Sequence, residues 1–120
     1  MLDCFIIMPI NPSFDRLFGT VVAALRARQL AYERADEITQ TGIIFDQIVK
    51  RIGQAKFCIA DLTGNNPNVN AEVGIAIAMG KPVILLTRDE FSNIPFDLRH
   101  YRVFGYKDSD AGYADLQKCS

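Results

Sequence analysis

The stretch FCIADLTGNNPNVNAEVGIAIAMGKPVILL, residues 57–86, decides the fold of this chain. A short apolar run over residues 57–60 leads into Asp61 and a loop rich in Gly, Asn and Pro. The pattern then predicts an apolar helix over residues 68–79 and a second buried strand over residues 82–87. A strand, a helix and a strand in this order indicate a parallel β-α-β unit.

The rest of the chain repeats this alternation. Further strands are expected over residues 4–10, 31–35 and 101–106. Further helices are expected over residues 13–29 and 41–54, with a partial helix from Ala111. The pattern predicts one α/β domain over residues 1–120, with a three-layer flavodoxin-like (Rossmann-like) architecture and a five-stranded parallel sheet in the order 2-1-3-4-5.

The boundaries of these elements have their own signals. Ser13 is a weak N-cap candidate for the helix over residues 13–29. Gly80 is typical of a left-handed cap after the helix over residues 68–79. The polar residues 88–98, which include Pro95, are expected to form a loop.

Length and charge limit the classes of partner. At 120 residues the chain has the size of one domain that folds around one core, although its short last helix leaves open whether it is a fragment of a longer protein. Thirteen basic and fourteen acidic residues give a net charge of −1, which favours neither a nucleic acid polymer nor an anionic membrane. A small-molecule partner fits this charge better.

The cysteines and the apolar runs indicate the compartment. Cys4 and Cys58 lie inside apolar runs, where thiols usually serve as small core residues, and the three cysteines show no CxxC spacing. The first apolar run is too short for a signal peptide or a membrane span, and Glu72 and Lys81 interrupt the later one. We therefore expect a soluble protein of the reducing cytoplasm.

Polar side chains follow four of the predicted strands. They are Asn11, Asp36, Asp61 and Arg88, and Glu72 lies in the first turns of the helix after Asp61. Ligands of open α/β sheets bind beyond the carboxyl ends of the strands, so these side chains are expected to share one crevice. Carboxylates at a partly dry rim cost free energy unless they bind something, which favours a functional site there.

Each acid also has a purely structural interpretation. An aspartate at a strand end often caps the following turn, which applies to Asp61 and Asp36. An acid in the first turns of a helix complements the helix dipole, which applies to Glu72. The combination of Asp61, Glu72 and the Asn-rich loop, in a mostly apolar helix, favours function.

Glycosidic-bond chemistry fits two carboxylates that act without a metal. One carboxylate attacks the anomeric carbon or stabilises an oxocarbenium ion, and another acid protonates the leaving group or orients the sugar. Other chemistries lack their residues: no GxxxxGK[ST], GxGxxG or GxSxG motif is present, and His100 is the only histidine. We therefore expect no cofactor and no metal, with Glu72 as the nucleophile.

The segment over residues 93–106 mixes aromatic and cationic residues, among them Arg99 and His100. It could supply a stacking or phosphate-binding lip to the crevice. An edge strand with a solvated charged face, or an oligomer interface, is the alternative.

The chain resembles the nucleoside 2-deoxyribosyltransferase-like superfamily, in particular its bacterial branch allied to TIR-like domains. The resemblance is carried by four blocks, which are FIIMPI (5–10), RADEI (34–38), ADLTGNNPNVNAEVGIAIAMGKPVILL (60–86) and IPFDLRHYRVFGY (94–106). It implies a flavodoxin-like fold and cleavage of an N-glycosidic bond in a nucleoside, nucleotide or NAD-like molecule, with the sugar passing to water or to another base.

The resemblance also implies residue roles. Glu72 matches the family's nucleophilic glutamate in an E-x-G motif, and Asp61 matches the aspartate that binds the substrate or protonates its base. Asp36 falls where the family often places a sugar or base contact. Further candidate substrate contacts from the matched blocks and the predicted rim are Met8, Pro9, Asn11, Asn68, Gly74, Arg88 and Arg99.

Three hypotheses follow from these residues. The first is an N-glycosidase or deoxyribosyltransferase with Glu72 as nucleophile. The second is a module that senses a nucleotide without turning it over, because Asn70 and Ala71 stand where relatives carry an aromatic pair. The third is a TIR-like assembly domain, and in each case a homodimer or higher homo-oligomer is expected.

Overall fold

A parallel sheet forms the centre of the molecule. The computed structural model describes residues 2–9, 11–34, 44–89, 101 and 103–119. The five-stranded sheet has the order β2-β1-β3-β4-β5, with every neighbouring pair parallel. Its strands are β1 (Cys4–Ile7), β2 (Tyr32–Arg34), β3 (Phe57–Asp61), β4 (Val83–Thr87) and β5 (Val103–Gly105). The predicted fold class and strand order are confirmed.

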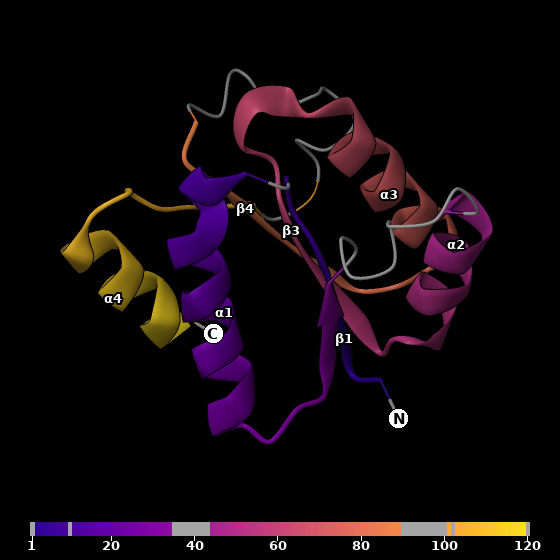
Figure 1. The fold of residues 1–120 in the computed structure, drawn as a ribbon, viewed down its shortest axis with the longest axis horizontal. Coiled ribbons are helices and arrows are strands. Elements are labelled where there is room, and N and C mark those ends of the chain that lie inside the picture. Colours follow the sequence, from indigo (N-terminus) through magenta and orange to yellow (C-terminus); the bar gives the residue numbers. More distant parts are fainter. Residues whose placement is uncertain (1, 10, 35–43, 90–100, 102, 120) are drawn as a thin grey trace.

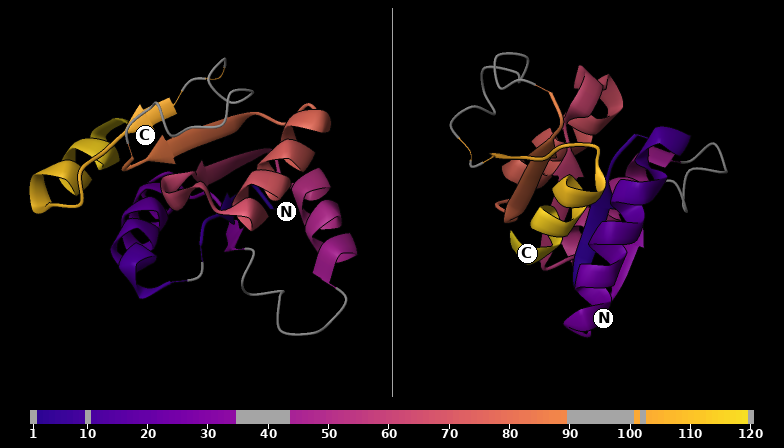
Figure 2. Two further views of the ribbon diagram at one scale, coloured as in Figure 1. Left: turned by 90° about the horizontal axis from the view of Figure 1, so that it is seen from above. Right: turned by 90° about the vertical axis from the view of Figure 1, so that its left-hand side faces the viewer.

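Helices cover both faces of the sheet. They are α1 (Asp15–Ala27), α2 (Ile44–Gln54), α3 (Pro67–Ala78) and α4 (Asp110–Cys119). Two 3₁₀ turns precede α1 and α3, namely η1 (Pro12–Phe14) and η3 (Thr63–Asn65). Figures 1 and 2 show α1 and α4 on one side of the sheet and α2 and α3 on the other. Within the described ranges no helix is both long enough and apolar enough to cross a bilayer.

The core consists of two apolar clusters, one in each layer. Successive residues of a strand point to opposite faces, so β1 sends Phe5 and Ile7 under α2 and α3 and Cys4 and Ile6 under α1 and α4. The same alternation explains why the sequence of β1 is apolar at every position. A strand buried on both faces needs apolar residues throughout.

The predicted core cysteines lie in different layers. Cys4 belongs to the cluster under α1 and α4, and Cys58 belongs to the cluster under α2 and α3. Both thiols are free and buried. Burial raises the pKa of Cys4 to about 12 and that of Cys58 to about 11, so both are protonated at neutral pH and serve as apolar packing residues.

The start of the chain departs from its predicted boundaries. The strand predicted over residues 4–10 ends at Ile7, because Pro9 has no backbone N–H to give to a neighbouring strand. Ser13 is not the helix cap. Asn11 caps the 3₁₀ turn η1 that leads into α1, since its side-chain oxygen accepts a hydrogen bond from the Ser13 backbone N–H at 2.9 Å, and α1 itself has no side-chain cap.

The deciding stretch is close to its prediction, with small shifts at the element ends. Asp61 is the last residue of β3. The helix α3 begins at Pro67, because the Asn66 side chain accepts hydrogen bonds from the N–H groups of Asn68 and Val69. Gly80 follows α3 with a φ of 74°, which confirms the left-handed cap.

The last strand and helix also differ slightly from prediction. The strand expected over residues 101–106 is confined to Val103–Gly105, and the last helix begins at Asp110, one residue before the predicted start. Most of the predicted loop over residues 88–98 and the predicted helix residues 41–43 lie outside the described residues.

Gly80 offers a test of this geometry. Gly80→Ala should lower the free energy of unfolding by about 1 kcal/mol, because a Cβ disfavours a positive φ. Gly19→Ala is the matched control. Gly19 lies inside α1 with open space where a Cβ would stand, so the free energy of unfolding should rise by about 1 kcal/mol. Urea denaturation measures both, and equal effects of the two substitutions would contradict the assignment.

Candidate active site

Three segments meet at the carboxyl ends of the central strands. The Thr63 hydroxyl oxygen accepts a hydrogen bond from the Arg88 backbone N–H at 2.9 Å, and the Gly64 N–H donates to the Asp89 carboxylate at 2.6 Å. Arg88 also extends its guanidinium toward the Ser13 carbonyl oxygen, at 3.4 Å. The loops after β1, β3 and β4 are thereby joined, as expected for the rim of an α/β sheet.

Asp61 is fully buried and both of its carboxylate oxygens accept hydrogen bonds. Its Oδ1 accepts from the Thr63 backbone N–H at 2.8 Å, and its Oδ2 accepts from the Tyr106 hydroxyl. Burial raises the pKa of Asp61 above its usual range, and the hydrogen bonds from Thr63 and Tyr106 offset this only in part. Both Asp61 oxygens, with which a substrate would have to form hydrogen bonds, therefore already accept hydrogen bonds from Thr63 and Tyr106.

The sheet register places Asp61 in the α1/α4 layer. Asp61 is the register partner of Leu86, and Leu86 is the partner of Phe104. Register partners in a parallel sheet point to the same face, and both Leu86 and Phe104 pack with the cluster under α1 and α4. Tyr106, which binds the Asp61 carboxylate, belongs to that cluster as well.

Glu72 lies in the opposite layer, on α3. The residues of α3 buried against the sheet are Val69, Val73 and Ala76, and Glu72 is beside this stripe and half-buried. Asp61 therefore points into the α1/α4 layer, whereas Glu72 belongs to a helix of the α2/α3 layer. That both acids face one crevice stays a prediction. The sequence pattern placed both near the rim but did not reveal the face that each would take.

The Glu72 carboxylate is in an unusual environment. Desolvation by burial raises its pKa from 4.5 to about 7, with no other cause. Among the described residues, no side chain or backbone group forms a hydrogen bond or salt bridge with it. Near neutral pH the side chain is therefore present in both protonated and ionised forms, which is the property expected of an acid–base or nucleophilic carboxylate.

Arg88, a predicted substrate contact, is held by protein groups. Its guanidinium lies 3.3 Å from the Asp108 carboxylate and 4.4 Å from the centre of the Phe14 ring. Asp108 in turn accepts a hydrogen bond from the Tyr113 hydroxyl at 2.5 Å. Arg88 thus links the end of β4 to η1 and to the α4 region, and its side chain is 15% exposed.

The remaining predicted contacts are spread over the rim and α3. Met8 is buried and Pro9 is half-buried after β1, whereas Asn11 is exposed and engaged in its capping bond. Asn68 and Gly74 are exposed on α3. Asp36 and Arg99, together with His100, lie outside the described residues. In the described part of the chain, no three His, Cys, Asp or Glu side chains form a group that could hold a metal ion.

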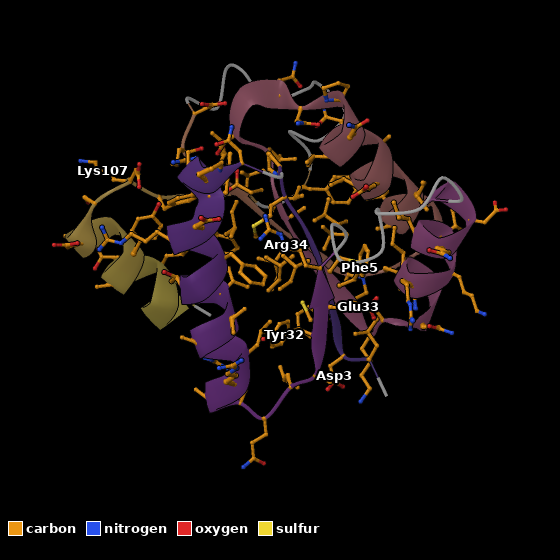
Figure 3. The ribbon with its side chains drawn as sticks, in the orientation of Figure 1. Asp3, Phe5, Tyr32, Glu33, Arg34 and Lys107 are labelled. Carbon is orange, nitrogen blue, oxygen red and sulfur yellow. The ribbon has the colours of Figure 1, made fainter. Side chains whose placement is uncertain are left out.

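Two residues near the rim were not predicted from the sequence. Tyr106 binds Asp61 across 45 positions of sequence, a separation at which no local motif points from one residue to the other. Arg34 is 8% exposed at the end of β2, donates to the Pro9 carbonyl oxygen at 3.3 Å, and lies 4.5 Å from the centre of the Phe18 ring. Figure 3 shows it between α1 and the sheet. The sequence signal that could have indicated Arg34 is its place at the end of a predicted strand, just before the acidic pair Asp36 and Glu37.

The fold is shared with two classes of protein, TIR domains and an N-glycosidase. Similar solved structures include the TIR domain of the Toll-related receptor TRR-2 from Hydra magnipapillata, with a TM-score of 0.72 and 16% identity over 99% of this chain and 98% of that one. The CMP N-glycosidase BcmB of Clostridium botulinum has a TM-score of 0.72 and 18% identity over 98% of each chain. The TIR domains of the activated Roq1 resistosome reach 0.60 and 15% over 72% of this chain and 57% of that chain.

No protein-family model matches the chain, and no curated protein matches it. At identities of 15–18% the structural similarity establishes the fold. The particular chemistry has to be argued from the residues of this chain.

The buried hydrogen bond between Tyr106 and Asp61 can be tested by removing its donor. Tyr106→Phe should lower the free energy of unfolding by about 1–3 kcal/mol, because a buried carboxylate oxygen loses its partner. Tyr101→Phe is the control, since Tyr101 is 44% exposed, and should change it by no more than about 0.5 kcal/mol. Equal effects of the two substitutions in thermal or urea denaturation would argue against the bond.

The raised pKa of Glu72 predicts a pH-dependent stability. Between pH 4.5 and about 7 the folded protein keeps a proton on Glu72 that the unfolded chain releases, so the free energy of unfolding falls as the pH rises. Glu72→Gln should remove this contribution, which is on the order of 2 kcal/mol. Urea denaturation at pH 5 and pH 8 measures the difference. Asp115→Asn, an exposed change on α4, is the control, and a Glu72→Gln profile parallel to the wild type would contradict the shift.

Proposed function

We propose that this protein cleaves the N-glycosidic bond of a nucleoside, nucleotide or NAD-like molecule, with Glu72 as the nucleophile. The observation that carries the proposal is the half-buried Glu72 carboxylate, which has a pKa of about 7 and no hydrogen-bond or ion-pair partner among the described residues. Such a group costs free energy in the free protein. A ligand that contacts it would offset the cost, which is why perturbed carboxylates are enriched at active sites.

The proposed reaction balances with water as the only co-reactant. An ionised Glu72 oxygen attacks the anomeric carbon, the C–N bond breaks, and its electron pair leaves with the base, which takes up a proton. Water then attacks the anomeric carbon of the glycosyl ester and releases the sugar, which restores the Glu72 carboxylate and supplies the proton. A second base in place of water would make the reaction a transfer, and no cofactor is required.

Asp61 has a positioning role in this proposal, in place of the substrate contact expected from the sequence. Its two oxygens accept from Thr63 and Tyr106, so it fixes the start of the loop between β3 and α3. That loop leads into the Asn66 cap from which α3 begins. Asp61 would therefore act on Glu72 through the placement of α3.

The substrate contacts remain proposals from the sequence. Asn11, which follows β1, and Asn68, in the first turn of α3, are exposed polar groups, and Met8 and Pro9 would border the sugar. Asn70, two residues before Glu72 on α3, has a buried Oδ1 with no hydrogen-bond partner in the described part of the chain. A ligand hydroxyl or amide could donate to it.

The structural similarities support the proposal. BcmB, whose fold matches over 98% of each chain, is a CMP N-glycosidase. A fold can host unrelated functions, so this likeness raises the expectation of N-glycosidic chemistry and the environment of Glu72 carries the argument.

The second candidate function is a TIR-like signalling or nucleotide-sensing module. It is favoured by the similarity to the TIR domain of TRR-2, which extends over 99% of this chain. In that case the protein would bind a nucleotide intact or assemble into a homo-oligomer. Calorimetry and light scattering would recognise it by nucleotide binding without product, or by mass that increases with concentration or nucleotide.

The catalytic proposal is tested by base release. Purified protein should release free base from at least one of a panel of deoxynucleosides, nucleoside monophosphates that include CMP, and NAD, measured by liquid chromatography. Glu72→Gln should reduce the rate by about 10³-fold or more, because the amide is not a nucleophile. Asp115→Asn should keep wild-type activity, since Asp115 is an exposed acid on α4.

Two outcomes would count against catalysis by Glu72. One is the absence of base release by the wild type across the panel. The other is full activity in Glu72→Gln, which would assign any observed reaction to another group. A circular dichroism spectrum of each variant separates a loss of chemistry from a loss of fold.

A further inference from the structure

A cavity lies in the layer opposite to Glu72. Its volume is about 230 Å³, and it is bordered by α1, α4 and the faces of β3, β4 and β5 that lie toward these helices. Most of its lining is apolar, with side chains that include Val21, Leu25, Ile59, Leu86, Phe104 and Leu116. Glu72 is not part of the lining, so the cavity is separate from the candidate active site.

The cavity is open to solvent along part of its lining. Ile84, which lines it from β4, is 36% exposed, although a large aliphatic side chain on a parallel strand is usually covered. The other apolar groups at its edge, Phe57 and Phe104, are half-buried. A partly open apolar cavity of this kind favours a ligand with an apolar body.

The lining contains two polar side chains, Thr20 and Arg28, and the only charge among them is positive. Thr20 uses its hydroxyl within its own helix, where it donates to the Arg16 carbonyl oxygen at 2.9 Å. Arg28 donates from Nη1 to the Ala24 carbonyl oxygen at 3.2 Å, and in the described part of the chain it forms no salt bridge. A guanidinium has five N–H donors, so most of them remain for a ligand. No acidic side chain contributes to the lining.

We propose that this cavity binds a medium-chain aliphatic carboxylate, with its chain among the apolar side chains and its carboxylate on Arg28. Charge complementarity supports an anion, because the lining offers one cation and no acid. The volume sets the length of the chain. An apolar cavity of about 150 Å³ holds benzene, so about 230 Å³ suits a chain of roughly eight to ten carbons.

The proposal is independent of the glycosidase proposal, since the two sites lie on opposite sides of the sheet. A carboxylate bound at Arg28 would cover Ile84 and link α1 to α4. Its binding would therefore raise the thermal stability of the protein.

Titration with sodium decanoate tests the proposal on the whole chain. Calorimetry should give one saturable site, and two-dimensional NMR should show shifts confined to α1, α4, β3, β4 and β5. Acetate supplies the charge without the chain, and decanol supplies the chain without the charge. Decanoate should bind at least about tenfold more tightly than either, because only it meets both requirements.

Variants locate the two halves of the site. Arg28→Leu should weaken decanoate about tenfold and leave decanol unchanged, because it removes the cation but not the apolar lining. Arg26→Leu is the matched control, since Arg26 lies in the last turn of α1, two residues before Arg28, but is not among the lining residues. Ala24→Leu should abolish decanoate binding, because the larger side chain fills the cavity. If Ala24→Leu does not fold, Ile84→Trp at the exposed edge of the cavity serves as the second blocking variant and should also abolish binding.

Three results would overturn the proposal. The first is no saturable binding of decanoate below about 1 mM. The second is binding that is equal in the wild type, Arg28→Leu and Ala24→Leu, which would indicate non-specific association. The third is a stable homodimer in light scattering that does not bind decanoate and is not dissociated by it. That result would mean that a second copy of the chain covers this surface.

Discussion

The burial of β1 and β3 on both faces is the constraint on which the rest of the structure depends. Each strand supplies alternate side chains to two separate apolar clusters, so both helical layers must be present for either strand to be covered. This arrangement also divides the chemistry of the molecule. Asp61 ends β3 with its side chain toward α1 and α4, while Glu72 belongs to the layer of α2 and α3. Neither acid can change face without a shift of the strand register or of a helix.

The sequence predicts the architecture well because its signals are local and periodic. Apolar runs, helical spacing and the Gly80 cap are each readable within a few residues, and they led to the observed strand order. The geometry of the candidate site could be predicted less well from such local patterns. The face taken by Asp61 follows from the pairing of β3 with β4, which the sequence does not specify, and its partner Tyr106 lies far away in the sequence. Asn11 rather than Ser13 caps the first helical segment, because a side chain's choice between neighbouring N–H groups depends on local geometry.

The fold itself is neutral between enzyme and signalling module, since structures of both kinds share it at similar TM-scores. What distinguishes the possibilities in this chain is the local environment of a few polar groups. In the part of the chain that the structure describes, the desolvated Glu72 carboxylate has no hydrogen-bond or ion-pair partner, whereas Asp61, Arg88 and Arg34 all have protein partners. A bound ligand could lower the free energy cost of burying the Glu72 carboxylate, whereas the side chains that already have protein partners hold the surrounding loops in place.

The two buried thiols give the molecule a built-in reporter for its own opening. Cys4 and Cys58 lie in different layers, and at neutral pH each is almost entirely in the thiol form, which is a poor nucleophile. An alkylating reagent can reach either sulfur only after the layer above it has separated from the sheet. Their relative labelling rates would therefore distinguish local opening of one helical layer from global unfolding of the whole molecule.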